Sequence, residues 1–137
     1  MAARLSWHDV HEGDELPPME LFLSKDQVRA YAYASGMTAP RFTDDAGAQL
    51  EGLPGMITPG NMSMGLLTRL VEQWAGQGGL RRLGTTFRGL VLPDRRIRLC
   101  GTVTEKDDSA RTVELDVWME SDDSERLVVG TATVELF

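Results

Sequence analysis

Two neighbouring carboxylates, Asp44 and Asp45, follow the stretch SGMTAPRF at 35–42 and are the first candidates for acid–base chemistry. A positioned carboxylate can take a proton from water or return one to a substrate. The same residues also suit the start of a short helix, where the helix dipole favours negative charge and lowers a carboxylate pKa. Because a lowered pKa weakens a base, the sequence leaves both a catalytic and a structural interpretation open.

The elements before this loop are a short strand at 18–24 and a helix at about 25–35. Ser24 and Gln27 have the spacing of a capping box, which predicts the start of that helix. One side of it carries Val28, Tyr31, Ala32 and Ser35. The loop therefore begins where this helix ends, at Gly36.

Frequent Gly and Pro residues between 36 and 60 predict a loop, with a short helical turn at 44–51. A second helix is expected at 61–76, ended by GQGG at 76–79. Its apolar stripe consists of Met62, Met64, Leu66, Leu67, Leu70, Val71 and Trp74. A stripe this wide predicts a helix that is buried on most sides.

The rest of the chain alternates apolar and polar residues, as half-buried strands do. Strands are expected at 96–106, 111–121 and 126–137, with turns at 92–95, 107–110 and 121–125. Long antiparallel strands after one buried helix predict an α+β fold in which a curved sheet wraps around the helix at about 60–76. The length of 137 residues fits one domain, 1–137.

Composition limits the functional classes. The net charge of −7 argues against general nucleic-acid binding, and no apolar run is long enough to span a membrane. The single Cys100 excludes an internal disulfide and, without a recognisable signal peptide, suits a cytoplasmic protein. We expect neither a cofactor nor a metal.

Three further stretches, in order along the chain, carry a resemblance to a family. They are YAYASG at 31–36, TTFRGLVLPDRRIRLCGTVTE at 85–105 and GTATVEL at 130–136. Together they resemble the hot-dog fold and, within it, the MaoC-like (R)-specific enoyl-CoA hydratases and 3-hydroxyacyl dehydratases. The second stretch resembles the family's hairpin, with Phe87, Val91, Pro93 and Asp94 in place and the Gly of the turn missing.

The resemblance also implies where catalytic residues would stand. The family motif reads Asp-x-Asn-x-x-His, and a later His-Gly pair begins the central helix. In this chain Met37, Ala39 and Phe42 occupy the motif positions, and Pro59 precedes Gly60. Met and Phe cannot transfer protons, and His8 and His11 lie in the N-terminal arm. The acid–base groups of a hydratase are therefore expected to be absent, with Asp44 or Asp45 as possible substitutes.

An acyl thioester, linked to coenzyme A or to a carrier protein, is the ligand that the resemblance implies. The amides of Gly60 and Asn61 can bind its carbonyl oxygen, or these residues can simply cap the helix. Met37, Phe42, Met62 and Met64 are the other candidate substrate contacts. The wider stripe of Met62, Met64, Leu66, Leu67 and Trp74 can line an acyl tunnel or belong to the core.

The basic side chains have two interpretations each. Six arginines can bind the phosphates of coenzyme A or form a solvated sheet face: Arg81, Arg82, Arg88, Arg95, Arg96 and Arg98. Arg41 can bind an anion or form a surface or inter-subunit ion pair. Cys100 is expected to be structural.

Two functional hypotheses remain. The first is a non-catalytic or supporting subunit that pairs with itself or with a second MaoC-like chain and shapes the acyl pocket. The second is an enzyme that uses the same pocket for cyclisation, isomerisation or thioester hydrolysis. The resemblance favours the first, because all the motif positions have changed together.

Overall fold

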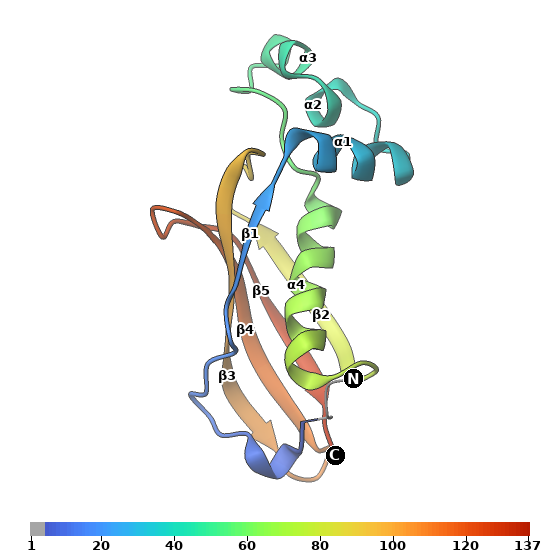
Figure 1. Ribbon diagram of the computed structural model, residues 1–137. Helices are drawn as coiled ribbons and strands as arrows, with labels where there is room; N and C mark the ends of the chain where they lie inside the picture. Colours follow the sequence, from blue (N-terminus) through green and yellow to red (C-terminus); the bar gives the residue numbers. More distant parts are fainter. Residues whose placement is uncertain (1–4) are drawn as a thin grey trace.

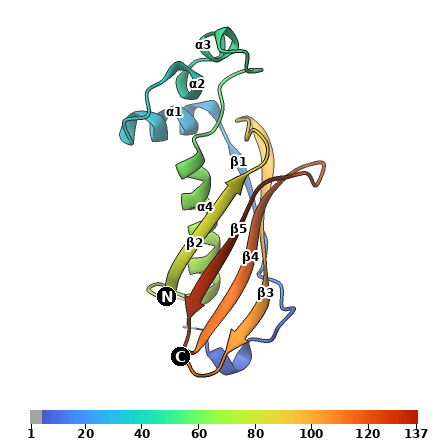
Figure 2. The same ribbon diagram turned by 180° about the vertical axis from the view of Figure 1, so that it is seen from behind.

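The computed structural model describes residues 5–137 as a curved antiparallel sheet with one long helix, α4 (Gly60–Ala75), against one face (Figures 1 and 2). The strands are β1 (Met19–Leu23), β2 (Leu80–Phe87), β3 (Arg95–Asp107), β4 (Thr112–Ser121) and β5 (Arg126–Glu135). Their order in the sheet is β1-β3-β4-β5-β2, and every neighbouring pair is antiparallel. This is the α+β architecture expected from the sequence.

Alternation along the three long strands is confirmed by burial. Every second side chain of these strands faces the helix, because successive residues of a strand point to opposite faces. The buried set is Ile97, Leu99, Val103, Val113, Leu115, Val117, Met119, Val128, Ala132 and Val134. These residues form one cluster with Leu67, Leu70 and Val71 of α4, so the helix and the sheet share a single core.

Helix α4 is buried on one side, which corrects the expectation that it is buried on most sides. Its exposed residues recur at every fourth position: Asn61, Gly65, Arg69 and Gln73. Residues four apart lie on the same face of a helix, so these four form an exposed stripe that points away from the sheet. The apolar stripe is wide because Met62, Leu66 and Trp74 line its flanks and are half-buried against the core.

The expected hairpin at 85–105 is wrong. Strand β2 pairs with β5 and not with β3, and two other strands lie between them. The segment 88–94 therefore crosses one end of the sheet (Figure 2). The first half of β2 was missed in the sequence because Arg81 and Arg82 are adjacent and the register shifts between Leu80 and Arg82, which breaks the alternation.

Three short helices form a cap beyond the N-terminal end of α4 (Figure 1). They are α1 (Lys25–Ala34), α2 (Pro40–Thr43) and α3 (Asp45–Leu50). The capping box is confirmed, since the Ser24 side chain accepts from the Gln27 N–H and the Gln27 side chain accepts from the Ser24 N–H. Helix α3 confirms the expected turn. Helix α2 was missed because Pro40 suggested a loop, whereas proline is well suited to the first position of a helix.

The N-terminal arm closes the opposite end of the sheet (Figure 1). It contains a 3-10 turn at Trp7–Asp9. The Trp7 N–H donates to the Phe137 carbonyl at 2.7 Å, and the Lys106 ammonium lies 3.7 Å from the centre of the Trp7 ring. His8 and His11 belong to this arm, at the far end from the cap. None of the described helices is long and apolar enough to cross a membrane.

Candidate functional site

The stretch SGMTAPRF connects α1 to α2, and its first residues end α1. Gly36 has a φ of 75°, and its N–H donates to the Tyr33 carbonyl at 3.3 Å. The Met37 N–H donates to the Ala32 carbonyl at 2.8 Å. These two bonds form a Schellman motif, in which glycine provides the left-handed turn that satisfies the last carbonyls of a helix. Met37 is thus fixed by its backbone, and its side chain is half-buried.

Ala39 directly precedes the short helix α2, and Phe42 lies within it. Ala39 is the N-cap residue, and its carbonyl accepts from the Phe42 N–H at 2.9 Å and from the Thr43 hydroxyl at 3.3 Å. The Phe42 ring is half-buried, with the Arg41 guanidinium carbon 5.8 Å from its centre. Arg41 itself forms an ion pair with Glu51 at 3.2 Å, both on the surface. None of Met37, Ala39 and Phe42 has a side chain that exchanges protons.

Asp44 is the N-cap of α3. Its carboxylate accepts from the Gly47 N–H at 2.9 Å, and its own N–H donates to the Pro40 carbonyl at 2.8 Å. The structural interpretation of this residue as a charge at a helix start agrees with that geometry. Gly47 permits close packing here, because a Cβ at this position would lie 2.5 Å from the Pro40 Cβ.

Asp45 bridges three segments of the cap. One carboxylate oxygen accepts from the Lys25 ammonium at 2.7 Å, and the other accepts from the Met56 N–H at 2.9 Å. The hydrogen bond from Lys25 and then that from Met56 hold the pKa of Asp45 below its usual value, while the bond to Asp45 raises the pKa of Lys25. Asp45 is therefore a poor base in this conformation. Lys25 was not identified from the sequence, where its position directly after the cap Ser24 is the one available signal.

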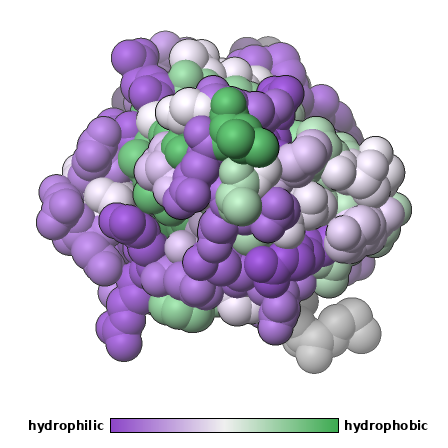
Figure 3. All heavy atoms as spheres, turned by 90° about the horizontal axis from the view of Figure 1, so that it is seen from above, coloured by the Kyte–Doolittle hydropathy of each residue, from purple (hydrophilic) through white to green (hydrophobic). Residues whose placement is uncertain are grey.

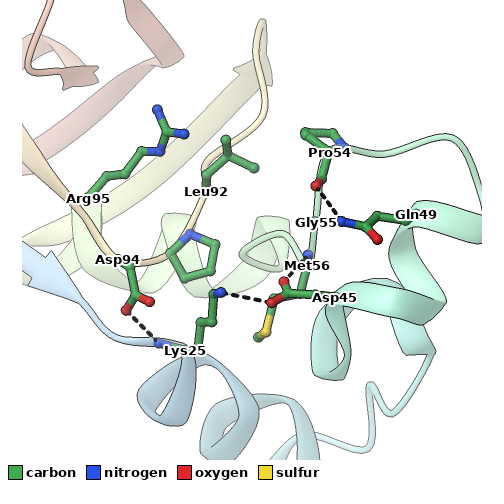
Figure 4. Close-up of a pocket in the computed structure, with 10 residues that line it drawn as sticks. Lys25, Asp45, Gln49, Pro54, Gly55, Met56, Leu92, Asp94 and Arg95 are labelled. Atoms are coloured by element: carbon green, nitrogen blue, oxygen red, sulfur yellow. Dashed lines mark hydrogen bonds and ion pairs between the residues drawn. The ribbon is translucent and has the colours of Figure 1, made fainter.

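The Lys25–Asp45 pair lines a cleft of about 370 Å³ between the cap and the crossing segment before β3 (Figure 4). The Asp94 carboxylate accepts from the Lys25 backbone N–H at 3.2 Å, and the Asp94 N–H donates to the Leu23 carbonyl at 2.7 Å. Other lining residues are Gln49, Pro54, Gly55, Met56, Leu92, Pro93 and Arg95. The two cationic side chains, Lys25 and Arg95, balance the two carboxylates, Asp45 and Asp94, so the cleft has no net charge.

The start of α4 presents free amides. Its N-cap residue is Pro59, which corrects the expectation that Gly60 or Asn61 caps the helix. The N–H groups of Met62 and Ser63 donate to the Pro59 carbonyl at 3.1 and 3.3 Å. Those of Gly60 and Asn61 have no hydrogen-bond partner within residues 5–137. Free N–H groups at a helix N-terminus attract a partly negative oxygen.

Three side chains near this helix start were not assigned from the sequence. The Thr58 and Ser63 hydroxyls are buried, at 5% and 1% exposure, and lack a hydrogen-bond partner among the described residues. The Phe87 ring points at Gly60, since a Cβ at position 60 would lie 2.8 Å from the ring Cζ. Buried small hydroxyls leave no pattern in a sequence, and Phe87 stood out there only as an aromatic of the family's hairpin.

The methionines of α4 differ from one another. Met62 is half-buried and packs against the core, as the core interpretation predicts. Met64 is half-buried but lies outside the described core cluster. Met64 thus has apolar surface left to contact a ligand or another chain.

The six arginines do not converge on one site. Arg81 and Arg82 of β2 contact residues of β5. Arg81 pairs with Glu135 at 2.9 Å, and Arg82 donates to the Thr131 hydroxyl at 3.1 Å. Arg95, Arg96 and Arg98 belong to β3, which is separated from β2 by two strands. Arg88 lines a groove on the outer sheet face with Trp118 and Arg126. The observed pairs favour a solvated sheet face.

Cys100 lies half-buried on the outer face of β3, next to Trp118 and Glu120. Burial, followed by the nearby Glu120 charge, raises the pKa of its thiol. A raised pKa lowers the thiolate fraction, so this cysteine is not an activated nucleophile.

The end of the molecule that carries the cap is largely hydrophilic, with hydrophobic side chains at separate places (Figure 3). Leu50 of α3 is 91% exposed and Tyr33 of α1 is 63% exposed. The residues described as candidate contacts lie instead in the loop 35–42 and at the start of α4.

Comparisons with known structures give the same fold. The (R)-hydratase from A. caviae involved in PHA biosynthesis superposes with a TM-score of 0.86 at 20% identity, over 93% of this chain and 98% of that chain. A chain of the ChsH1-ChsH2 complex from Mycobacterium tuberculosis superposes with a TM-score of 0.85 at 19% identity, over 93% of this chain and 98% of that chain. A MaoC-like dehydratase has a TM-score of 0.91 at 27% identity, and the match covers 96% of this chain and 42% of that longer chain.

Sequence comparison points the same way. No curated protein sequence matches the chain significantly. The model of the MaoC like domain matches residues 10–124, which include the cap, α4 and most of the sheet. The chain therefore has the hot-dog fold and belongs to the MaoC-like family of hydratases and dehydratases.

Proposed function

We propose that this chain is a MaoC-like subunit that binds an acyl thioester without hydrating it on its own, and that supports the acyl pocket of a hydratase or dehydratase assembly. Met37, Ala39 and Phe42 stand at the positions where the family's Asp, Asn and His are expected. The observation that carries the proposal is that the nearby carboxylates are already engaged. Asp44 caps α3, and Asp45 is bound by Lys25 and Met56.

Thioester binding is supported by the start of α4. As negative charge builds up on a thioester oxygen, fixed N–H donors stabilise it. Gly60 and Asn61 supply two such amides, and Met37, Phe42, Met62 and Met64 supply apolar surface for the acyl group. Binding uses these groups whether the carrier is coenzyme A or a carrier protein.

The partner is a second hot-dog chain, either another copy or a MaoC-like chain with the complete motif. Strand β2 is at the edge of the sheet and leaves one row of backbone groups unpaired in the single chain. A free edge of this length favours pairing with another strand. The likeness to a chain of the ChsH1-ChsH2 complex supports an assembly with a second chain. We expect light scattering to give the mass of a dimer or larger assembly at micromolar concentration. We also expect the protein to be cytoplasmic.

The test of the function is an assay of the purified chain with crotonyl-CoA and longer enoyl-CoA thioesters. We expect binding but no hydration above background, because general acid–base groups contribute about 10²- to 10⁴-fold each. Addition of a MaoC-like partner that has the complete motif should restore hydration. Robust hydration by the chain alone that survives both Asp44→Asn and Asp45→Asn would contradict the proposal.

A second candidate function follows from the cleft at Asp45. Here the chain is an enzyme for cyclisation, isomerisation or thioester hydrolysis, and Asp45 transfers a proton once substrate displaces Lys25. The cleft of about 370 Å³ beside this carboxylate is the observation in its favour. Turnover that is abolished by Asp45→Asn, with the fold intact, would select this candidate.

A further inference from the structure

Phe87 has an unusual place for a large apolar side chain. It is the last residue of β2, and its side chain is 52% exposed. Its ring is directed at the first residue of α4. A Cβ on Gly60 would lie 2.8 Å from the ring Cζ and 3.2 Å from each Cε. The tip of the ring therefore stands over the helix start that carries the free amides of Gly60 and Asn61.

The backbone around Phe87 is fixed, whereas its ring is not enclosed. The N–H groups of Arg88 and Gly89 both donate to the Leu127 carbonyl, at 2.8 and 3.0 Å. The Val91 carbonyl accepts from the Thr58 N–H at 2.8 Å, which ties the crossing segment to the residues just before α4. The half-exposed ring can therefore rotate about its side-chain bonds while the backbone stays in place.

The same end of α4 also contains polar groups without partners. The Thr58 and Ser63 hydroxyls are more than nine-tenths buried and make no hydrogen bond to any described residue. Buried hydroxyls are normally satisfied by protein, water or ligand, and these two find no protein partner among the described residues. They lie two residues before and three residues after Gly60.

We propose that Phe87 is the wall of the acyl pocket at the start of α4 and restricts this chain to short acyl groups. The inference rests on the thioester binding proposed above. An acyl group whose carbonyl oxygen meets the Gly60 and Asn61 amides has its first carbons beside the Phe87 ring. A longer chain must displace the ring or turn away from it.

The test is calorimetric titration of the full chain with butyryl-CoA and octanoyl-CoA, which are saturated and cannot be hydrated. We expect the wild type to bind butyryl-CoA at least as tightly as octanoyl-CoA. Phe87→Ala should shift this preference towards octanoyl-CoA by about tenfold or more, because each additional buried methylene is worth about fourfold in affinity. Phe87→Leu should give a smaller shift in the same direction.

Phe22→Ala is the matched control. Phe22 is 54% exposed on β1, at the other edge of the sheet, and its loss should change neither affinity. Octanoyl-CoA binding by Phe87→Ala when the wild type binds neither thioester would contradict the restriction to short acyl groups, since the ring would then close the pocket altogether.

Two further results would overturn the proposal. If the wild type binds butyryl-CoA and Phe87→Ala keeps the same preference, Phe87 is not the wall, while the proposed thioester binding stands. A fall from dimer to monomer mass in that variant would then assign the ring to the interface between chains. If neither thioester binds to the wild type or to Phe87→Ala, both the wall and the proposed binding function fail.

Discussion

The sheet with α4 and the cap of α1–α3 are stabilised in different ways. In the sheet, the buried positions of β3, β4 and β5 carry apolar side chains that meet those of α4 in one core. In the cap, buried apolar residues are few and small, namely Val28, Ala32 and Ala48. Its three helices have 10, 4 and 6 residues, too short to be stable alone, so specific hydrogen bonds and ion pairs hold them.

The difference separates what keeps the fold from what performs chemistry. The core depends on volume and apolar surface, and these are unrelated to any reaction. The cap contains the loop 35–42, and its polar contacts fix where that loop lies. Three features of the cap fix the backbone within and just after this loop: the Schellman turn at Gly36, Pro40 at the start of α2 and the Asp44 cap. We infer that this scaffold holds the loop in place although Met37 and Phe42 cannot transfer protons.

The largest effect should come from a cavity in the sheet. Leu115 on the central strand β4 is fully buried, and Leu115→Ala should lower the free energy of unfolding by about 2–5 kcal/mol. Urea denaturation measures this loss. Asp116→Ala removes the next, outward-facing side chain and should change stability by no more than about 0.5 kcal/mol. Equal losses in the two variants would contradict the inward and outward assignment of β4.

The second effect tests whether the cap still supports chemistry. The triple variant Met37→Asp, Ala39→Asn and Phe42→His introduces acid–base groups at the positions where the resemblance to the family places them. We expect weak hydration of crotonyl-CoA, about 10²-fold or more above the wild type, since correctly placed groups of this kind have at least that effect. We also expect a stability loss of about 1–3 kcal/mol, because the Phe42 ring is half-buried. Loss of stability without any hydration would mean that the loop no longer places these groups correctly.

Most of the sheet could be predicted because its signal is local. Alternation in 96–106, 111–121 and 126–137 reports directly which side chains are buried. The partner of β2 could not be predicted in this way, since pairing between strands distant in sequence leaves no periodic pattern. The hairpin at 85–105 was inferred from a resemblance, and the chain instead crosses the end of the sheet to reach β3.

The candidate site was harder to predict than the fold. The amino-acid sequence was enough to show that Met37, Ala39 and Phe42 lack acid–base groups and that Asp44 suits a helix start. It did not show that Lys25 binds Asp45, because the two residues are 20 positions apart on different helices. It did not place the Phe87 ring over Gly60 either, since that contact depends on how the end of β2 meets α4.

The smallest effect should come from the Lys25–Asp45 ion pair. Asp45→Asn keeps an oxygen that can accept from the Met56 N–H but removes the charge that faces Lys25. The two side chains are 38% and 39% exposed, so water screens the pair, and the melting temperature should fall by a few degrees at most. The pKa values of both partners determine how the contribution of the pair to stability changes with pH. The pKa of Asp45 is lowered in the folded chain, so its contribution is complete above the usual value of 3.8 and is lost as pH falls through the lowered pKa.

At high pH the contribution of the same pair to stability is lost as pH rises, because Lys25 then loses its proton. The pKa of Lys25 is raised above its usual value of 10.5, so the contribution of Lys25 is complete below that value and is lost as pH rises through the raised pKa. The difference in melting temperature between wild type and Asp45→Asn should therefore be constant between these limits and shrink beyond them. Asp26→Asn is the control, because its pair with Arg29 is 95% exposed on the aspartate side and should contribute less. A difference that grows as pH falls from neutrality towards the usual value of 3.8 would show that the pKa of Asp45 is raised and not lowered, and would return this carboxylate to the list of candidate bases.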